Sequence, residues 1–141
     1  MRWLVMASLI IAIVTAAKGY FSKRNFSKQD NAIRHWTATI AHVQLIVGIV
    51  LYSQSPIAKY FLANLKTAIK SWDLLFFGVI HALLMLTAIV VITVGSALSK
   101  RQESDHNKFK VMLAWFSIAL LIIFVAIPWP FSPLASRPYF R

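Results

Sequence analysis

The sequence predicts an all-α integral membrane protein, a four-helix bundle with an amphipathic interfacial helix between its second and third helices. Of the 141 residues, 59% are hydrophobic and 13% are charged, whereas a soluble domain carries about 45–50% apolar and about 25% charged residues. The apolar residues form four long runs, each near the roughly 20 residues that cross about 30 Å of hydrocarbon as a helix. A backbone in lipid must satisfy its own amide groups, so helix is the expected form. The runs are residues 3–21, 36–53, 74–98 and 111–129.

The first run, residues 3–21, could also be a signal peptide, because Arg2 precedes it. It exceeds the length of a typical signal-peptide core, however, and it ends in KGYFSKR where a cleavage site would carry small residues. We therefore expect it to be a membrane helix of the mature protein. The sequence has no cysteine, which excludes thiolate metal sites, iron–sulfur clusters and thiol–disulfide exchange.

The connection between the second and third runs, residues 57–72, has the pattern of an amphipathic helix. A step of about 100° per residue gathers its large apolar side chains on one arc and its lysines on the opposite face. Such a helix lies in the lipid head-group plane, and Pro56 suits its first turn, where a missing amide hydrogen costs nothing. We expect a structural interfacial helix, with a lid or docking surface as the alternative. The arc holds Ile57, Phe61, Leu65, Ile69 and Trp72, and the lysines are Lys59, Lys66 and Lys70.

The sequence ends in PWPFSPLASRPYFR, whose prolines prevent the fourth helix from continuing. We expect residues 130–141 to anchor the chain at the membrane interface, with aromatic rings at head-group level and Arg137 and Arg141 on lipid phosphates. Docking onto another protein, or covering the mouth of the bundle, is the alternative. No repeat or second core is visible, so residues 1–141 are expected to form a single membrane domain.

The formal charge of +11 is spread unevenly over the connections. Nine basic residues fall in the connections after the first and third runs, and six fall on the opposite side. Because cytoplasmic loops carry the excess of lysine and arginine, we expect both termini outside the cytoplasm. The charges flank membrane helices and form no single stripe, so membrane lipids with anionic head groups, and no nucleic acid, are their expected partners. The nine are Lys18, Lys23, Arg24, Lys28, Arg34, Lys100, Arg101, Lys108 and Lys110; the six are Arg2, Lys59, Lys66, Lys70, Arg137 and Arg141.

The four acidic residues lie in connections or at helix ends, and none lies inside a span. Ion-coupled transporters use intramembrane groups that change charge, and only histidines are available here for that purpose. No Ser–His–acid or His–Glu metal arrangement lies within a span either. We therefore expect no catalytic residue, and no metal other than a haem iron. The acidic residues are Asp30, Asp73, Glu103 and Asp105.

The stretch RHWTATIAH places His35 and His42 on one helical face. Seven residues separate them by about 10 Å along the helix axis, and metal–nitrogen bonds are only about 2 Å long. The pair is therefore not a metal site by itself. His35 is expected at the membrane boundary, and His106, in SDHNK, in a solvated connection.

Two histidines lie inside the spans, and they are the candidate cofactor-binding residues: His81 first and His42 second. Histidine is a standard axial ligand of haem iron. Thr39 could orient the His42 ring, and Gly78 could let a flat macrocycle approach the third helix. The alternative is that the small residues allow close helix packing, with histidine as a polar link between helices. An expected offset of about 10 Å in depth argues against one iron bound by both. We expect His42, Gln44, Gly48, Gly78 and His81 to face the bundle interior.

Several segments resemble a family of short four-span bacterial membrane proteins commonly labelled cytochrome-b-like. They are RHWTATIAHVQL, SPIAKYF, FFGVIH, ITVGSA and the ending IPWPFSPLASRPYFR. The resemblance covers nearly the whole chain, and it implies a bacterial cytoplasmic (inner) membrane protein that binds haem b. Members of that family carry a histidine just before the pair that is Arg2–Trp3 here, which would lie near the outer end of the first helix, on the side of His81. This sequence, which begins with Met1, does not include that histidine.

Two functions follow as hypotheses. The first is a cytochrome-b-like protein that transfers electrons through haem b, with quinone or a larger membrane complex as partner. The second is a non-catalytic accessory or scaffold subunit that binds no cofactor and acts through its tail and amphipathic helix. A carrier of small molecules is the third and least favoured reading.

Overall fold

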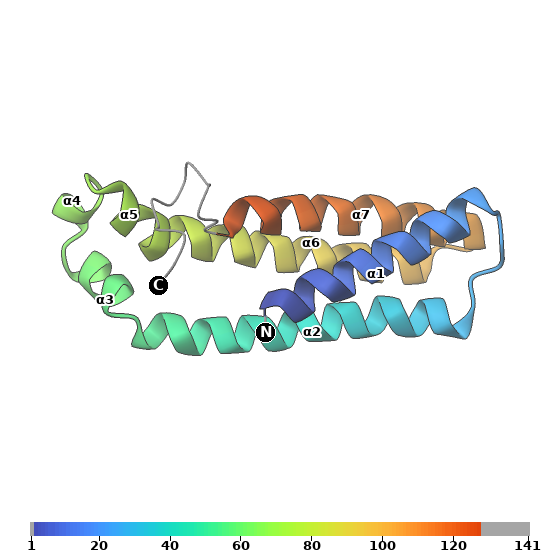
Figure 1. Ribbon diagram of the computed structural model, residues 1–141, viewed down its shortest axis with the longest axis horizontal. Coiled ribbons are helices and arrows are strands. Elements are labelled where there is room, and N and C mark those ends of the chain that lie inside the picture. The colour runs from blue at the N-terminus through green and yellow to red at the C-terminus, as the bar shows by residue number, and fades with distance from the viewer. Residues whose placement is uncertain (1, 128–141) are drawn as a thin grey trace.

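Four long helices lie side by side in this computed structural model, which describes residues 2–127 (Figure 1). The third of them is continuous through a short π-helix, η1, and the connection before it holds two short helices. No strand occurs within the described residues. The predicted all-α four-helix fold is therefore confirmed. The elements are α1 (Arg2–Phe21), α2 (Lys28–Gln54), α3 (Pro56–Ala63), α4 (Leu65–Ala68), α5 (Trp72–Leu75), η1 (Phe76–Ile80), α6 (His81–Arg101) and α7 (Asp105–Ala126).

Each long helix is long and apolar enough to cross a membrane: Trp3–Phe21, Lys28–Gln54, Trp72–Arg101 and Asp105–Ala126. The outward faces of these helices are also suited to lipid. Large aliphatic side chains stand exposed on all four, among them Ile11 at 56%, Leu51 at 62%, Leu83 at 56% and Leu121 at 66%. Contiguous apolar surface of this kind is rare on soluble monomers. The chain is a multi-pass membrane protein.

Two of these helices begin earlier in the sequence than their apolar runs, because polar residues cap them. At α2, the Ser27 hydroxyl accepts from the Asp30 amide at 3.2 Å, and the Asp30 carboxylate accepts from the Ser27 amide at 2.8 Å. This reciprocal capping box satisfies two backbone donors that a helix start leaves unpaired. At α7, the Ser104 hydroxyl accepts from the Asn107 amide at 3.2 Å. The helices therefore extend beyond the lipid-soluble runs.

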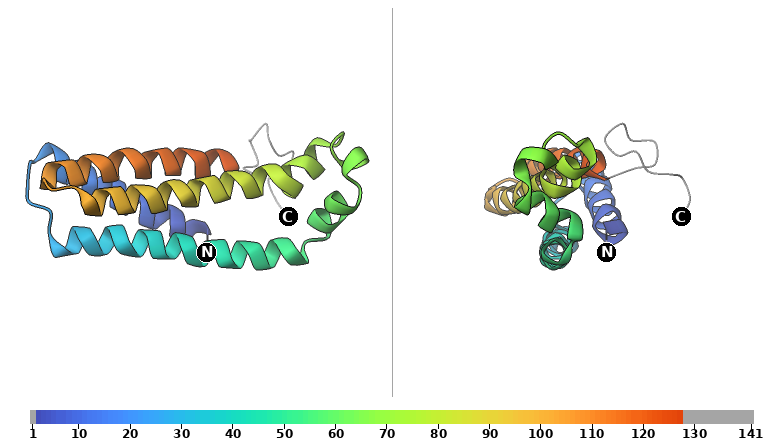
Figure 2. Two further views of the ribbon diagram at one scale, coloured as in Figure 1. Left: turned by 180° about the vertical axis from the view of Figure 1, so that it is seen from behind. Right: turned by 90° about the vertical axis from the view of Figure 1, so that its left-hand side faces the viewer.

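Around the bundle, α1 packs on α2 and α7, and α6 packs on α7 and α2 (Figure 2). The core is made of small and aromatic side chains, with Ala16, Ala41 and Ala119 fully buried beside Phe109 and Phe116. Glycine brings helices together at two crossings. A Cβ atom on Gly19 would overlap the ring of Phe109, and one on Gly95 would overlap the Trp115 side chain. In lipid, where the hydrophobic effect does not drive helices together, such small residues allow the close van der Waals packing that does.

The long helices differ in length, and the candidate site lies where the shorter ones end. At 1.5 Å per residue, the 20 residues of α1 span about 30 Å and the 27 residues of α2 about 40 Å. In Figure 1, α2 and the α5–η1–α6 helix extend past the N-terminal end of α1 and the C-terminal end of α7. The segment containing α3 and α4 joins the two protruding ends.

The sequence predicted one continuous helix over residues 57–72. The structure divides this connection into separate short helices. The connection breaks at Asn64, whose backbone has φ −130° and ψ 46°. The Asn64 side-chain amide donates to the Tyr60 carbonyl at 3.2 Å, so asparagine ends α3 by competing for its last carbonyl groups. The predicted apolar arc is consequently divided: Phe61 is buried, whereas Ile69 and Trp72 are about half exposed. The predicted anchoring tail, residues 130–141, lies outside the described residues.

Candidate functional site

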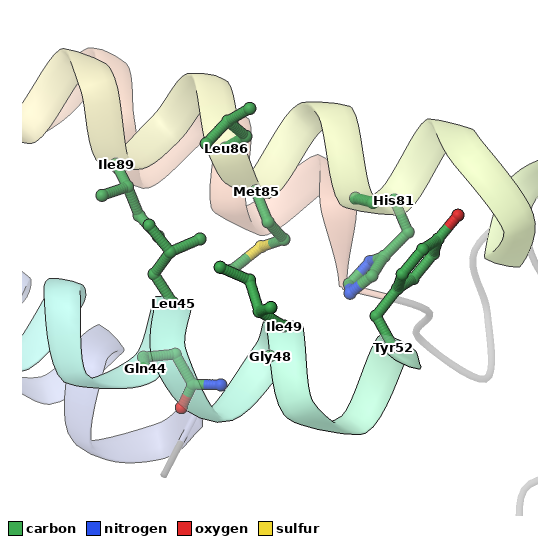
Figure 3. Close-up of a pocket in the computed structure, with 10 residues that line it drawn as sticks. Gln44, Leu45, Gly48, Ile49, Tyr52, His81, Met85, Leu86 and Ile89 are labelled. Carbon is green, nitrogen blue, oxygen red and sulfur yellow. The ribbon is translucent and has the colours of Figure 1, made fainter. Parts of the chain in front are cut away.

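A cavity of about 300 Å³ lies between α2 and α6, at the level where α1 and α7 end. Each wall is a row of side chains spaced by four residues, which places them on one helical face. The α2 row is Gln44, Gly48 and Tyr52, and the α6 row is His81, Met85 and Ile89 (Figure 3). Most of the lining is aliphatic, so the few polar groups determine what it can bind.

His81 is the first residue of α6 and follows the π-helix directly. Its backbone amide donates to the Phe76 carbonyl, five residues earlier. The additional residue in this turn advances all later side chains by about 100° relative to a regular α-helix. In Figure 3, the His81 ring and Met85 extend from α6 toward α2. Turns of this kind are often found at functional sites.

One hydrogen bond determines the tautomer of His81. The ring Nδ1 lies 2.8 Å from the carbonyl oxygen of Ala126, the last residue of α7. A carbonyl only accepts, so Nδ1 carries the proton and Nε2 of the neutral ring keeps its lone pair. Among the described side chains, residues 3–127, Nε2 has no hydrogen-bond partner. The bond also satisfies one of the carbonyls that the end of α7 leaves unpaired. His81 is therefore fixed in orientation and offers a free nitrogen ligand.

A second cavity of about 180 Å³ lies against the same ring. It shares Gln44, His81 and Met85 with the first cavity, and its other walls include Val5 of α1 and Ile123 of α7. His81 thus lines two neighbouring cavities. One faces the α2–α6 interface, and the other faces the ends of α1 and α7.

Gln44 is the second polar group at the cavity. Its Oε1 atom is buried and has no hydrogen-bond partner within the described part of the chain. Leaving such a group unpaired costs about 1–3 kcal/mol. Rotation of the amide would present its NH₂ group instead. Gln44 can therefore accept from, or donate to, a molecule bound beside His81.

The two glycines near the site have different roles. A Cβ atom on Gly48 would meet nothing within 4 Å, so the α2 backbone is open to the cavity there. A Cβ atom on Gly78 would lie 2.5 Å from Cγ of Phe61. The Tyr52 hydroxyl also donates to the Gly78 carbonyl. The surface of Gly78 is therefore covered by α3 and α2, and the expectation that it admits a flat macrocycle is wrong.

His42 lies elsewhere. Its Nδ1 donates to the Ala38 carbonyl at 2.7 Å, and its Nε2 lies 3.1 Å from the Thr93 hydroxyl of α6. Thr93 follows His81 by twelve residues, or about 18 Å along α6. The structure therefore does not bring His42 and His81 together, and their separation exceeds the expected 10 Å. His42 is also exposed rather than enclosed. Thr39 does not orient it, because the Thr39 hydroxyl donates to the His35 carbonyl at 3.0 Å.

The other two histidines lie outside the cavity. His35 is exposed, with its ring centre 6.2 Å from that of Trp36. His106 stacks on Tyr20 at 4.4 Å between ring centres, so it contacts α1 as well as solvent. Among residues 2–127, no group of three or more histidine or acidic side chains could hold a metal ion.

Sequence reasoning missed Tyr52 and Met85 as lining residues. The signal was present, because they continue the four-residue spacing from Gln44 and His81. It also missed Arg34, which was counted as a connection charge. Arg34 is 5% exposed and donates to the Ser96 carbonyl at 2.9 Å. No local pattern distinguishes this arginine from its exposed neighbours.

No protein-family model, curated protein sequence or solved structure matches this chain. The arrangement of its own residues, with the resemblance noted in its sequence, is therefore the basis for a proposal about function.

Proposed function

We propose that this protein is a small electron-transfer protein of the bacterial cytoplasmic membrane that holds haem b at His81. One observation carries the proposal: the His81 ring is fixed through Nδ1–H on the Ala126 carbonyl, and its Nε2 lone pair is free beside an apolar cavity. Metal-binding histidines use this arrangement, in which a backbone carbonyl fixes the tautomer and strengthens the free nitrogen as a ligand. Haem iron takes histidine as its proximal ligand.

The remaining residues would have supporting roles. Met85 and Ile89 line an apolar wall, and burial in such surroundings is one means by which a protein sets a haem potential. Gly48 leaves room on the opposite wall, and Gln44 offers a hydrogen bond to a polar edge of the cofactor. Haem itself would supply one-electron chemistry. His42 is not part of this proposal, because Ala38 and Thr93 occupy both of its nitrogens.

A lipid-soluble quinone is the electron partner that fits this location best. Ile49 and Leu86 line the cavity and are 59% and 47% exposed on the outer surface of the bundle. The cavity therefore opens toward the lipid between α2 and α6. A molecule dissolved in the bilayer can approach it there without crossing the protein.

The alternative is an accessory subunit without a cofactor, and one observation favours it. A volume of about 300 Å³ is at the lower end of the 300–1,000 Å³ typical of ligand pockets, and a porphyrin macrocycle needs more space than that. Haem binding would require α2 to move away from α6. These two helices pack less closely than the other neighbouring pairs of long helices.

The absorption spectrum of the purified protein tests the proposal. The chain would be produced in a haem-replete bacterial host, extracted in mild detergent and examined for a Soret band. We expect the band in the wild type, its loss in His81→Ala, and its recovery when imidazole is added to that variant. His42→Ala is the matched control and should keep the band.

Two results would contradict haem binding at His81. One is a colourless wild-type protein with the helical circular dichroism of a folded bundle. The other is a band that survives in His81→Ala and disappears in His42→Ala. The first result would favour the accessory-subunit alternative, and the second would favour a different haem ligand.

A further inference from the structure

A basic cavity of about 290 Å³ lies at the other end of the bundle, away from His81. It forms where the α1–α2 connection meets the turn between α6 and α7, at the right-hand end of Figure 1. Three lysines, one from each of α2, α6 and α7, converge on it. Its lining residues are Phe26, Ser27, Lys28, Asn31, Lys100 and Lys108.

The acidic residues nearby do not neutralise these lysines fully. The Asp30 carboxylate accepts two hydrogen bonds from Arg24, each 2.6 Å long, and others from Ser27. The Asp105 carboxylate accepts from Lys108 at 2.9 Å. Among the side chains that the structure describes, residues 3–127, these are the two ion pairs, so Lys28 and Lys100 have no acidic partner there. Glu103, in the same turn, is exposed and forms no ion pair within the described chain.

A buried arginine adds positive charge behind the cavity wall. Arg34 is 5% exposed and donates to Ser96 and, at 2.9 Å, to the Asn31 side-chain oxygen. Its Nε–H has no hydrogen-bond partner in the described structure. Because the Asn31 oxygen is occupied, the Asn31 NH₂ group remains available to the cavity as a donor. The side chains at this cavity therefore present mainly donors and uncompensated positive charge, which an anion would relieve.

We propose that this cavity binds the phosphate group of an anionic phospholipid. Lysine ammonium groups bind phosphate as point charges, and an amide NH₂ adds a directional hydrogen bond. A lipid is the expected source of the phosphate, because the cavity adjoins the ends of the membrane-spanning helices and includes the Phe26 ring. Basic pockets between helices at this depth suit lipid head groups. The proposal does not depend on a cofactor at His81.

Lipid retention by the full-length protein tests this site. Protein purified in detergent would be titrated with phosphatidylglycerol, phosphatidylcholine or inorganic phosphate, with binding followed by native mass spectrometry and by the shift in Tm. We expect tighter binding of phosphatidylglycerol than of phosphatidylcholine. The double variant Lys28→Gln, Lys100→Gln should weaken phosphatidylglycerol binding by about tenfold or more, since each lysine contributes attraction to the anionic lipid.

The double variant Lys59→Gln, Lys66→Gln is the matched control. It removes the same charge from exposed lysines in the connection at the opposite end of the bundle. We expect it to leave phosphatidylglycerol binding unchanged. Equal weakening by both double variants would overturn the proposal, because attraction would then depend on overall charge. Stabilisation by inorganic phosphate equal to that by phosphatidylglycerol would also overturn it, because the site would then recognise a free anion.

Discussion

A histidine in lipid needs partners for two ring nitrogens, and His42 and His81 meet this need differently. His42 uses both nitrogens, one on the Ala38 carbonyl of its own helix and one on the Thr93 hydroxyl of α6. His81 uses one, on Ala126. The sequence alone identified both residues as candidates, because both are histidines within apolar runs. It could not separate them, because their partners are a carbonyl at the end of another helix and a hydroxyl 51 positions away.

Removing the hydroxyl of Thr93 tests the His42 link. Thr93→Val keeps the shape of the side chain and deletes two contacts of the hydroxyl, the one with Nε2 of His42 at 3.1 Å and the one it donates to the Ile89 carbonyl at 2.7 Å. We expect a loss of about 0.6 kcal/mol in the free energy of unfolding, the average for hydrogen bonds between membrane helices. Unfolding in mixed detergent micelles, followed by circular dichroism, would measure it.

Thr87→Val is the control for that change. The Thr87 hydroxyl donates only within its own helix, to the Leu83 carbonyl at 2.8 Å, and the residue is exposed like Thr93. We expect a smaller effect there. If both variants lose the same stability, the contact between His42 and Thr93 contributes nothing beyond the loss of a hydroxyl.

The packing of whole helices depends on which glycines face a neighbour. Gly95 of α6 lies against Trp115 of α7, whereas Gly48 of α2 faces open space. Gly95→Ala would press a methyl group on the Cβ atom of Trp115, which the α7 backbone holds in place. We expect a loss of about 1–3 kcal/mol in stability, the usual cost of overpacking, measurable as a lower Tm in detergent.

Gly48→Ala is the matched substitution in a long helix of the same bundle. Alanine forms helix better than glycine by about 0.8–1 kcal/mol, and nothing obstructs the new methyl group. This variant should be as stable as the wild type or more so. A destabilised Gly48→Ala together with a neutral Gly95→Ala would mean that the packing of α6 against α7 differs from that described.

Sequence patterns predicted some elements well and others not at all. The four long helices were predictable, because a run of about 20 apolar residues crosses lipid as an α-helix. The break at Asn64 and the π-helix at Phe76–Ile80 were not. The break follows from one local hydrogen bond, from the Asn64 side chain to the Tyr60 carbonyl, which the apolar pattern does not register. The π-helix is held by tertiary contacts, since Phe61 packs on Gly78 and Tyr52 donates to the Gly78 carbonyl. The sequence therefore predicted the helix that carries His81, but not the cavity that His81 lines.

The orientation of the whole molecule is a prediction from charge alone. With nine basic residues in the first and third connections and six on the other side, the first and third connections are expected in the cytoplasm. The sequence contains no cysteine, so single cysteines can report on each side without background. Asn25→Cys probes the first connection, and Thr67→Cys probes the second, and both positions are exposed.

A membrane-impermeant maleimide applied to intact cells should label Thr67→Cys and not Asn25→Cys. Labelling of Asn25→Cys should appear only after the cells are permeabilised. Neither substitution changes the charge on which the prediction rests. The opposite labelling pattern would show that the orientation is the reverse of the predicted one, with the basic cavity at the outer leaflet.

The unequal lengths of the helices limit what a redox centre at His81 could do. From His81 to Arg101, α6 runs about 30 Å, the thickness of the hydrocarbon layer. A group bound to His81 would therefore lie close to one aqueous boundary and far from the other. One such centre cannot by itself carry an electron across the membrane. Donor and acceptor would both have to meet it on the same side, and its turnover would add no charge to the membrane potential.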